Sequence, residues 1–150
     1  MTHMRGTVLL LDGGSSRDAN AEYFRAHELV VYDTARPDAA LERLDSVTPD
    51  VVVAFVGAGD PSVVRALRSR MDDAASLIIV SDGDTLEERE QHRAAGADSF
   101  LSHPSQPDEV LYEIRRALIL RRSGRRLPWN WPEEPQPQTR WWSRVLGARS

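Results

Sequence analysis

Five short apolar runs, spaced regularly along the chain, constrain the fold more than any other feature of the sequence. Most are apolar at every residue rather than at every second one, which indicates strands covered on both faces, as in a parallel sheet. The runs are Thr7–Leu11, Leu29–Tyr32, Val51–Val56, Leu77–Val80 and Ser99–Ser102.

Helical patterns follow each of these runs. Thr85 and Glu88 have the spacing of a capping box, and Asp60 precedes a proline suited to the first helical position. Such alternation predicts an α/β fold: a doubly wound five-stranded parallel sheet with helices on both faces. Right-handed crossovers then place every β-to-α loop at the carboxyl edge of the sheet, where we expect a functional site. The expected helices are Ser16–His27, Pro37–Leu44, Asp60–Ser69, Thr85–Ala95 and Gln106–Arg122.

The composition changes after Arg122. We therefore predict a domain over residues 1–122 and a Pro-, Trp- and Arg-rich C-terminal tail over residues 123–150, which could end in a short helix capped by Thr139. The first 120 residues are net acidic and the remainder is net basic. This division favours either two functional zones or a tail that folds back onto the domain.

Composition excludes several kinds of chemistry. The chain has no Cys, and all 19 of its basic residues are Arg. Thiolate nucleophiles, disulfides, Schiff-base lysines and a P-loop lysine are thus excluded. We also find no triad and no metal-ligand cluster, so we expect no enzyme, no metal and no cofactor. No apolar run approaches the ~20 residues that span a bilayer, and no signal peptide is evident, so we expect a cytoplasmic location.

Several strings resemble the receiver domains of bacterial two-component response regulators. The segment Ala94–Pro104 (AAGADSFLSHP), followed by Gln106–Glu109, is similar to the family's "aGAddyl-x-KP" segment. Pro49–Val53 resembles the "pDlvl" opening of the third strand, and Leu77–Ser81 resembles the fourth strand with its terminal hydroxyl. The resemblance spans roughly residues 7–122 and implies a flavodoxin-like sheet with strand order 2-1-3-4-5.

The phosphorylation chemistry of that family does not carry over to this sequence. A receiver binds a divalent cation through two acidic residues after its first strand, but here Asp12 is followed by Gly13. The phosphoacceptor aspartate would fall five residues after Asp50, where the chain has Phe55. A phenyl ring neither accepts a phosphoryl group nor binds a metal. His103 replaces the lysine that precedes the proline.

Two receiver features persist in this degenerate pocket: Ser81 matches the switch hydroxyl and Phe100 the switch aromatic of the fifth strand. We expect Phe55 to fill the former pocket with apolar bulk, against Phe100 or His103, and to lock one conformation. The competing interpretation is neutral decay of an unused site.

Two loops at the expected edge are candidates for ligand binding. Gly13, Gly14, Ser15 and Ser16 could cradle an anion at a helix N-terminus, although they could also form only a capped turn. Asp82 and Asp84 could join Asp12 in an acidic pocket for a cation or an amine, or belong to a solvated turn.

The tail holds every Trp of the chain. For the segment Leu127–Trp131 we favour packing on the domain through Arg–carboxylate complementarity. The rest of the tail suggests a partner-docking helix or a weak membrane-surface anchor, of which the second is the less favoured. Nucleic-acid binding is not expected because no DNA-binding motif is present. The partner-binding candidates are Trp129, Trp131, Arg140, Trp141, Trp142, Arg144, Val145 and Leu146.

Two functions remain open at this stage. The first is a pseudo-receiver that acts without phosphorylation as a protein–protein interaction module in bacterial signalling or localisation. The second is a receiver-like domain that senses a small ligand at the carboxyl edge of the sheet. By resemblance, a homodimer through the fourth helix, fifth strand and fifth helix is also plausible.

Overall fold

The structure is a computed structural model that describes residues 5–57, 61–83, 85–102 and 106–129. Five strands form one parallel sheet in the order β2-β1-β3-β4-β5, which confirms the predicted doubly wound α/β fold. The strands are β1 (Thr7–Leu11), β2 (Val30–Thr34), β3 (Val51–Val56), β4 (Ser76–Ser81) and β5 (Ser99–Ser102). Among the described residues, no helix combines the length and apolarity needed to cross a membrane.

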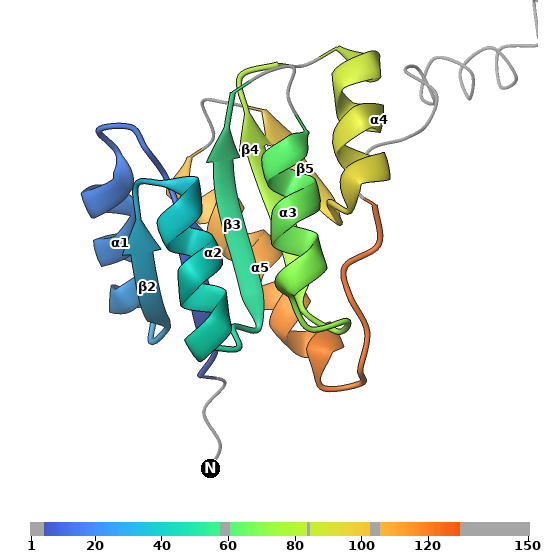
Figure 1. Ribbon diagram of the computed structural model, residues 1–150. Coiled ribbons are helices and arrows are strands. Elements are labelled where there is room, and N and C mark those ends of the chain that lie inside the picture. The colour runs from blue at the N-terminus through green and yellow to red at the C-terminus, as the bar shows by residue number, and fades with distance from the viewer. Residues whose placement is uncertain (1–4, 58–60, 84, 103–105, 130–150) are drawn as a thin grey trace, which may run out of the picture.

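Helices cover both faces of the sheet (Figure 1). Helices α2, α3 and α4 pack on one face and α1 and α5 on the other, so each face has its own apolar core. The central strands β3 and β4 are fully buried over most of their length, which explains their unbroken apolar sequence. The helices are α1 (Arg17–Ala26), α2 (Pro37–Ser46), α3 (Ser62–Arg70), α4 (Leu86–Ala95) and α5 (Pro107–Arg121).

Helix starts follow local chemistry. The capping box predicted before α4 is present: the Glu88 N–H donates to the Thr85 hydroxyl at 3.1 Å, and the Thr85 N–H donates to the Glu88 carboxylate at 3.4 Å. Helix α3 begins at Ser62, one residue after Pro61, and Asp60 lies outside the described residues.

The folded unit continues past α5. Leu127 is only 3% exposed, and its N–H donates to the Ser76 hydroxyl at 2.9 Å. Arg126 pairs with Asp98 at 3.1 Å, and Trp129 packs on the core beneath α2, α3 and α4. This is the packing that the sequence favours for Leu127 and Trp129. We call residues 123–129 the strap.

Asp98 anchors the strap from inside the domain. Its carboxylate accepts the Leu77 N–H at 2.8 Å and lies 3.5 Å from Arg68 and 3.1 Å from Arg126. Burial raises the pKa of Asp98 above its ordinary value, while the Leu77 hydrogen bond and the two arginines lower it in part.

Candidate functional site

A cleft of about 490 Å³ opens at the carboxyl edge of the sheet. Seven of the residues that sequence analysis assigned to this edge line it, so the structure brings both candidate loops and the β3 phenylalanine into one site. These residues are Asp12, Gly13, Gly14, Ser15, Ser16, Phe55 and Asp82. Val56, Gly57 and Val80 complete the lining.

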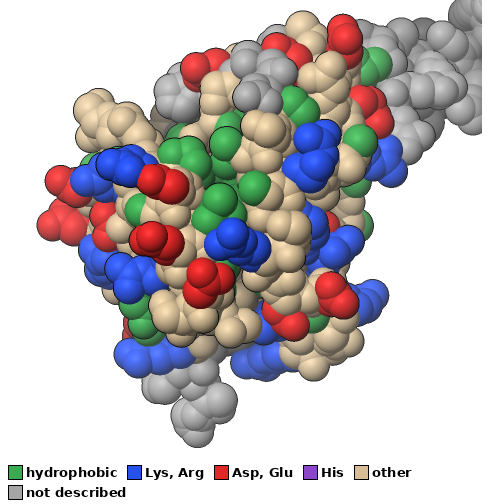
Figure 2. Space-filling view, in the orientation of Figure 1, with side chains coloured by type: hydrophobic (Ala, Val, Ile, Leu, Met, Phe, Trp, Pro, Cys, Tyr) green, Lys and Arg blue, Asp and Glu red, His purple; other side chains and the backbone are tan. Residues whose placement is uncertain are grey.

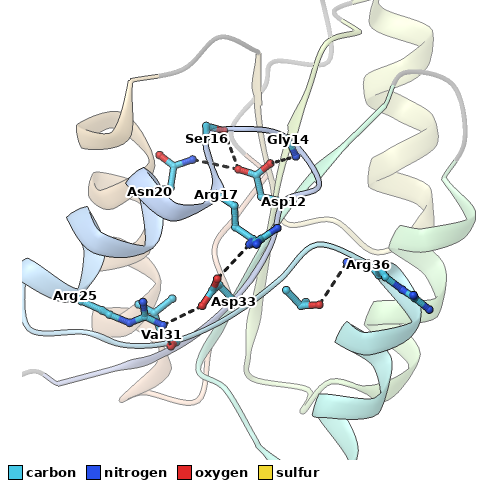
Figure 3. A network of polar contacts seen from close by, with 10 residues as sticks. Asp12, Gly14, Ser16, Arg17, Asn20, Arg25, Val31, Asp33 and Arg36 are labelled. Carbon is cyan, nitrogen blue, oxygen red and sulfur yellow. Dashed lines mark hydrogen bonds and ion pairs between the residues drawn. The ribbon is translucent and has the colours of Figure 1, made fainter.

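Asp12 organises one wall of this cleft. It directly follows β1 and is 2% exposed. Its carboxylate accepts the Gly14 N–H at 2.8 Å, the Ser16 hydroxyl at 2.9 Å and the Asn20 amide at 3.4 Å (Figure 3). Three donors around a buried carboxylate satisfy it and fix the loop that leads into α1.

Ser16 has a different role from simple capping. It occupies the N-cap position of α1 but makes no capping hydrogen bond with its side chain, because its hydroxyl donates to Asp12 instead. Asn20, which was not predicted as a site residue, lies one helical turn after Ser16 and therefore faces the same carboxylate. That spacing could have identified it.

A second, apolar cleft of about 310 Å³ adjoins the first. The two share Gly13, Phe55, Val56 and Gly57, so the Phe55 side chain borders both. Figure 2 shows hydrophobic side chains gathered near the upper ends of α2 and α3. The other residues lining this cleft are Leu11, Ala35, Pro37 and Val63.

Phe55 packs against the core on the α1 and α5 face. Phe100 belongs to the opposite core, where it is fully buried and its ring lies 5.8 Å from that of His92 in α4. The expected packing of Phe55 against Phe100 is therefore wrong. Phe55 aligns with Val80 of β4 whereas Phe100 aligns with Ile79, and successive residues of a strand point to opposite faces. The alternative neighbour, His103, lies outside the described residues.

The loop after β4 contributes fewer residues to the cleft than we expected from the sequence. Ser81 is buried and its hydroxyl accepts the Gly83 N–H at 3.1 Å, but Ser81 does not line the cleft. Asp82 is exposed and does line it. Asp84 lies outside the described residues, so the acidic pair expected from this loop is represented here by Asp82 alone.

A second polar network lies beside the Asp12 loop and was not predicted. Asp33 of β2 receives Arg17 at 3.2 Å and Arg25 at 3.0 Å, and Arg25 also donates to the Val31 carbonyl at 2.6 Å (Figure 3). These contacts link α1 to the edge strand β2. Arg17 and Arg25 are therefore both paired with the Asp33 carboxylate.

Only one of the partner-binding candidates in the tail lies within the described residues. Trp129 is half-buried, and the guanidinium of Arg93 in α4 lies 5.7 Å from the centre of its ring. Trp131, Arg140, Trp141, Trp142, Arg144, Val145 and Leu146 fall outside them. Over the described ranges, no three His, Asp or Glu side chains gather in an arrangement that could hold a metal ion.

Comparisons with known proteins give one clear result. No family model and no curated protein matches the sequence. Many solved structures match the fold, among them a CheY-like response regulator receiver domain from Methanospirillum hungatei JF-1. It has a TM-score of 0.71 and 16% identity, over 79% of this chain and 97% of the other.

Two bacterial proteins give similar values. The chemotaxis response regulator CheY4 of Vibrio cholerae has a TM-score of 0.65 and 21% identity, over 75% of this chain and 98% of the other. The receiver domain of a Francisella response regulator has a TM-score of 0.65 and 22% identity, over 79% of this chain and 98% of the other. At these identities the likeness shows the fold alone: over 79% of its length this chain has the fold of a receiver domain.

Proposed function

We propose that this chain is a pseudo-receiver that accepts no phosphoryl group and acts as a protein–protein interaction module in bacterial signalling or localisation. The observation that carries this proposal is Phe55. It stands near the end of β3 and lines the edge cleft. The receiver domains that this sequence resembles carry the acceptor aspartate at this position.

The neighbouring positions support the same conclusion. Phosphoryl transfer to a receiver needs a carboxylate nucleophile, a cation held by carboxylates and a positive group for the phosphoryl oxygens. Here the nucleophile is replaced by Phe55 and the second metal ligand by Gly13, while His103 replaces the lysine. The carboxylate that remains, Asp12, is engaged by three donors of its own loop.

Direct phosphorylation tests the first half of the proposal. The full chain is incubated with Mg²⁺ and acetyl phosphate, beside a receiver that retains its aspartate as the positive control, and intact masses are measured. We expect the control to gain a phosphoryl group and this chain to remain unmodified. An acid- and hydroxylamine-labile phosphoryl group on this chain would overturn the proposal.

Partner capture tests the second half. The full chain is immobilised and exposed to an extract of native cells. It is expected to retain a partner equally well with and without beryllofluoride and Mg²⁺. Deletion of residues 136–150 is expected to abolish capture, because that segment carries the Trp- and Arg-rich docking candidate. Capture that requires beryllofluoride would contradict independence from phosphorylation.

The cleft itself favours a second candidate function, the sensing of a small ligand. The Gly13–Ser16 loop and Asp82 meet in one cleft of about 490 Å³, within the size range of small-molecule sites. A thermal-shift screen with nucleotides, polyamines and other metabolites tests this candidate, because a ligand that binds the folded state raises the Tm. A stabilising ligand whose effect persists without residues 136–150 and disappears in Ser16→Trp would favour sensing over docking.

A further inference from the structure

Helix α5 presents a stripe of exposed side chains on the side that points away from the sheet. Tyr112 is 64% and Ile119 57% exposed, and these are two of the three exposed large hydrophobic residues in the described ranges. Asp108, Arg115 and Arg122 are exposed as well. Together the five residues recur at intervals of four, three, four and three, which is the spacing of a helix–helix packing seam. We call them the α5 stripe.

The stripe is a different surface from the side of α5 that faces β5. Glu113 marks that side, because its carboxylate accepts the Ser99 hydroxyl of β5 at 3.3 Å. Each residue turns an α-helix by about 100°, so Tyr112 points well away from Glu113. The buried residues Val110, Ile114 and Ala117 face the core on the side opposite the stripe.

The charges along the stripe are complementary to their own reversed order. Asp108 lies in the first turn of α5 and Arg122 at its C-cap, each seven residues from Arg115, while Tyr112 lies three and Ile119 four residues from Arg115. If a second helix of the same sequence runs antiparallel with Arg115 at the centre, Asp108 meets Arg122 of the copy, and Tyr112 is offset from Ile119 of the copy by one residue, about 1.5 Å along the helix axis. The two helix dipoles also oppose each other favourably in this arrangement.

We propose that the α5 stripe is a docking surface for a second copy of this chain, with the two α5 helices packed antiparallel about a two-fold axis near Arg115. A two-fold interface requires a self-complementary patch, and the order acid, apolar, base, apolar, base meets this requirement except at the axis. There, Arg115 faces its own copy. This pair of like charges weakens the dimer. The inference does not depend on the function proposed above.

The size of the stripe sets the strength of the association. Helix α5 has 15 residues, which correspond to a length of roughly 22 Å at 1.5 Å per residue. One helix pair of this length buries less than the roughly 1,600 Å² of a standard stable interface. We therefore expect a reversible dimer with a Kd on the order of micromolar or weaker.

Charge reversal tests the antiparallel arrangement. The Kd of self-association of the full chain is measured by sedimentation equilibrium, for the wild type and for Asp108→Arg, Arg122→Glu and the double variant. Each single reversal places two like-charge pairs in the interface and is expected to weaken the dimer roughly tenfold. The double variant restores both pairs with inverted signs and is expected to regain the wild-type Kd. Arg65→Glu, an exposed reversal on α3, serves as the matched control.

Single cysteines locate the contact directly, because the chain has no Cys of its own. Arg115→Cys lies at the proposed axis and also removes the repelling charge, so mild oxidation is expected to link it into dimers. Arg65→Cys on α3 and Glu90→Cys on α4 are expected to stay monomeric under the same conditions.

Three results would overturn the inference. They are a full chain that remains monomeric up to millimolar concentration, a double variant that dimerises no better than the singles, and cross-linking at Glu90→Cys in place of Arg115→Cys. The last would assign self-association to the face formed by α4 and β5. Thermal melts of each variant check that the exposed substitutions leave the fold intact.

Discussion

Phe55 borders both clefts and packs on the core beneath α1 and α5. Phe55→Ala is expected to merge the clefts and to lower the free energy of unfolding by about 1–3 kcal/mol, less than for a fully buried ring. Urea unfolding measures this loss. Tyr112→Ala, which removes an exposed aromatic ring, is the matched control and is expected to change stability by less than about 0.5 kcal/mol.

The same residue allows a test of how many substitutions account for the proposed loss of phosphorylation. Phe55→Asp alone is expected to stay unmodified in acetyl phosphate, since Gly13 supplies no second carboxylate for the cation. The triple variant Gly13→Asp, Phe55→Asp, His103→Lys returns the required groups. Phosphorylation of the single variant would show that Phe55 was the sole obstacle.

Asp12 lines the cleft, but its main role is structural, because its carboxylate holds the loop that leads into α1. Asp12→Ala removes the acceptor of three donors, and we expect it to destabilise the fold by about 2–3 kcal/mol. Asp12→Asn keeps an oxygen acceptor and is expected to lose less. Asp82→Ala, at an exposed carboxylate of the same cleft, is expected to leave the midpoint of urea unfolding nearly unchanged. Equal losses at Asp12 and Asp82 would contradict this distinction.

At the scale of elements, the strap closes the amino-terminal end of β4. Leu127→Ala is expected to cost about 2–4 kcal/mol, the range for a buried leucine, although this residue follows the last helix. Arg125→Ala, an exposed change two residues earlier, is expected to cost almost nothing. Chemical denaturation of both variants distinguishes a strap that belongs to the folded unit from one that merely lies on it.

Asp98, which pairs with Arg126 of the strap, makes the stability of the fold sensitive to pH. Its pKa is raised above 3.8 in the folded state because burial disfavours the charged carboxylate. The folded state therefore holds the proton at pH values where the unfolded state has released it, and folding loses stability as the pH rises through the raised pKa. In Asp98→Asn this loss is expected to disappear, so the difference in unfolding free energy between wild type and variant should change over that range. A constant difference would indicate an ordinary pKa.

For the whole molecule, the sequence predicts the sheet better than the site. The bounds of β1, β3 and β5 follow from their apolar runs, whereas β4 extends to Ser76 and Ser81, whose burial only the tertiary structure shows. The loops that meet in the cleft could be predicted because parallel strands end at one edge. The sequence did not predict that Phe55 and Phe100 point to opposite faces of the sheet, because this depends on the register between strands.

The arrangement of the whole domain also predicts how it responds to receiver activators. A ligand shifts a conformational equilibrium only by as much as its affinities for the two states differ. Phe55 packs on one core and Phe100 is fully buried in the other. If the chain is the pseudo-receiver proposed above, beryllofluoride with Mg²⁺ finds no acceptor aspartate at the Phe55 position and favours neither state. Hydrogen exchange of β4, α4 and β5 is therefore expected to be the same with and without these ions. A receiver that retains its aspartate provides the positive control. Slower or faster exchange in α4 of this chain would mean that the domain still switches, and the fixed conformation inferred from Phe55 would have to be abandoned.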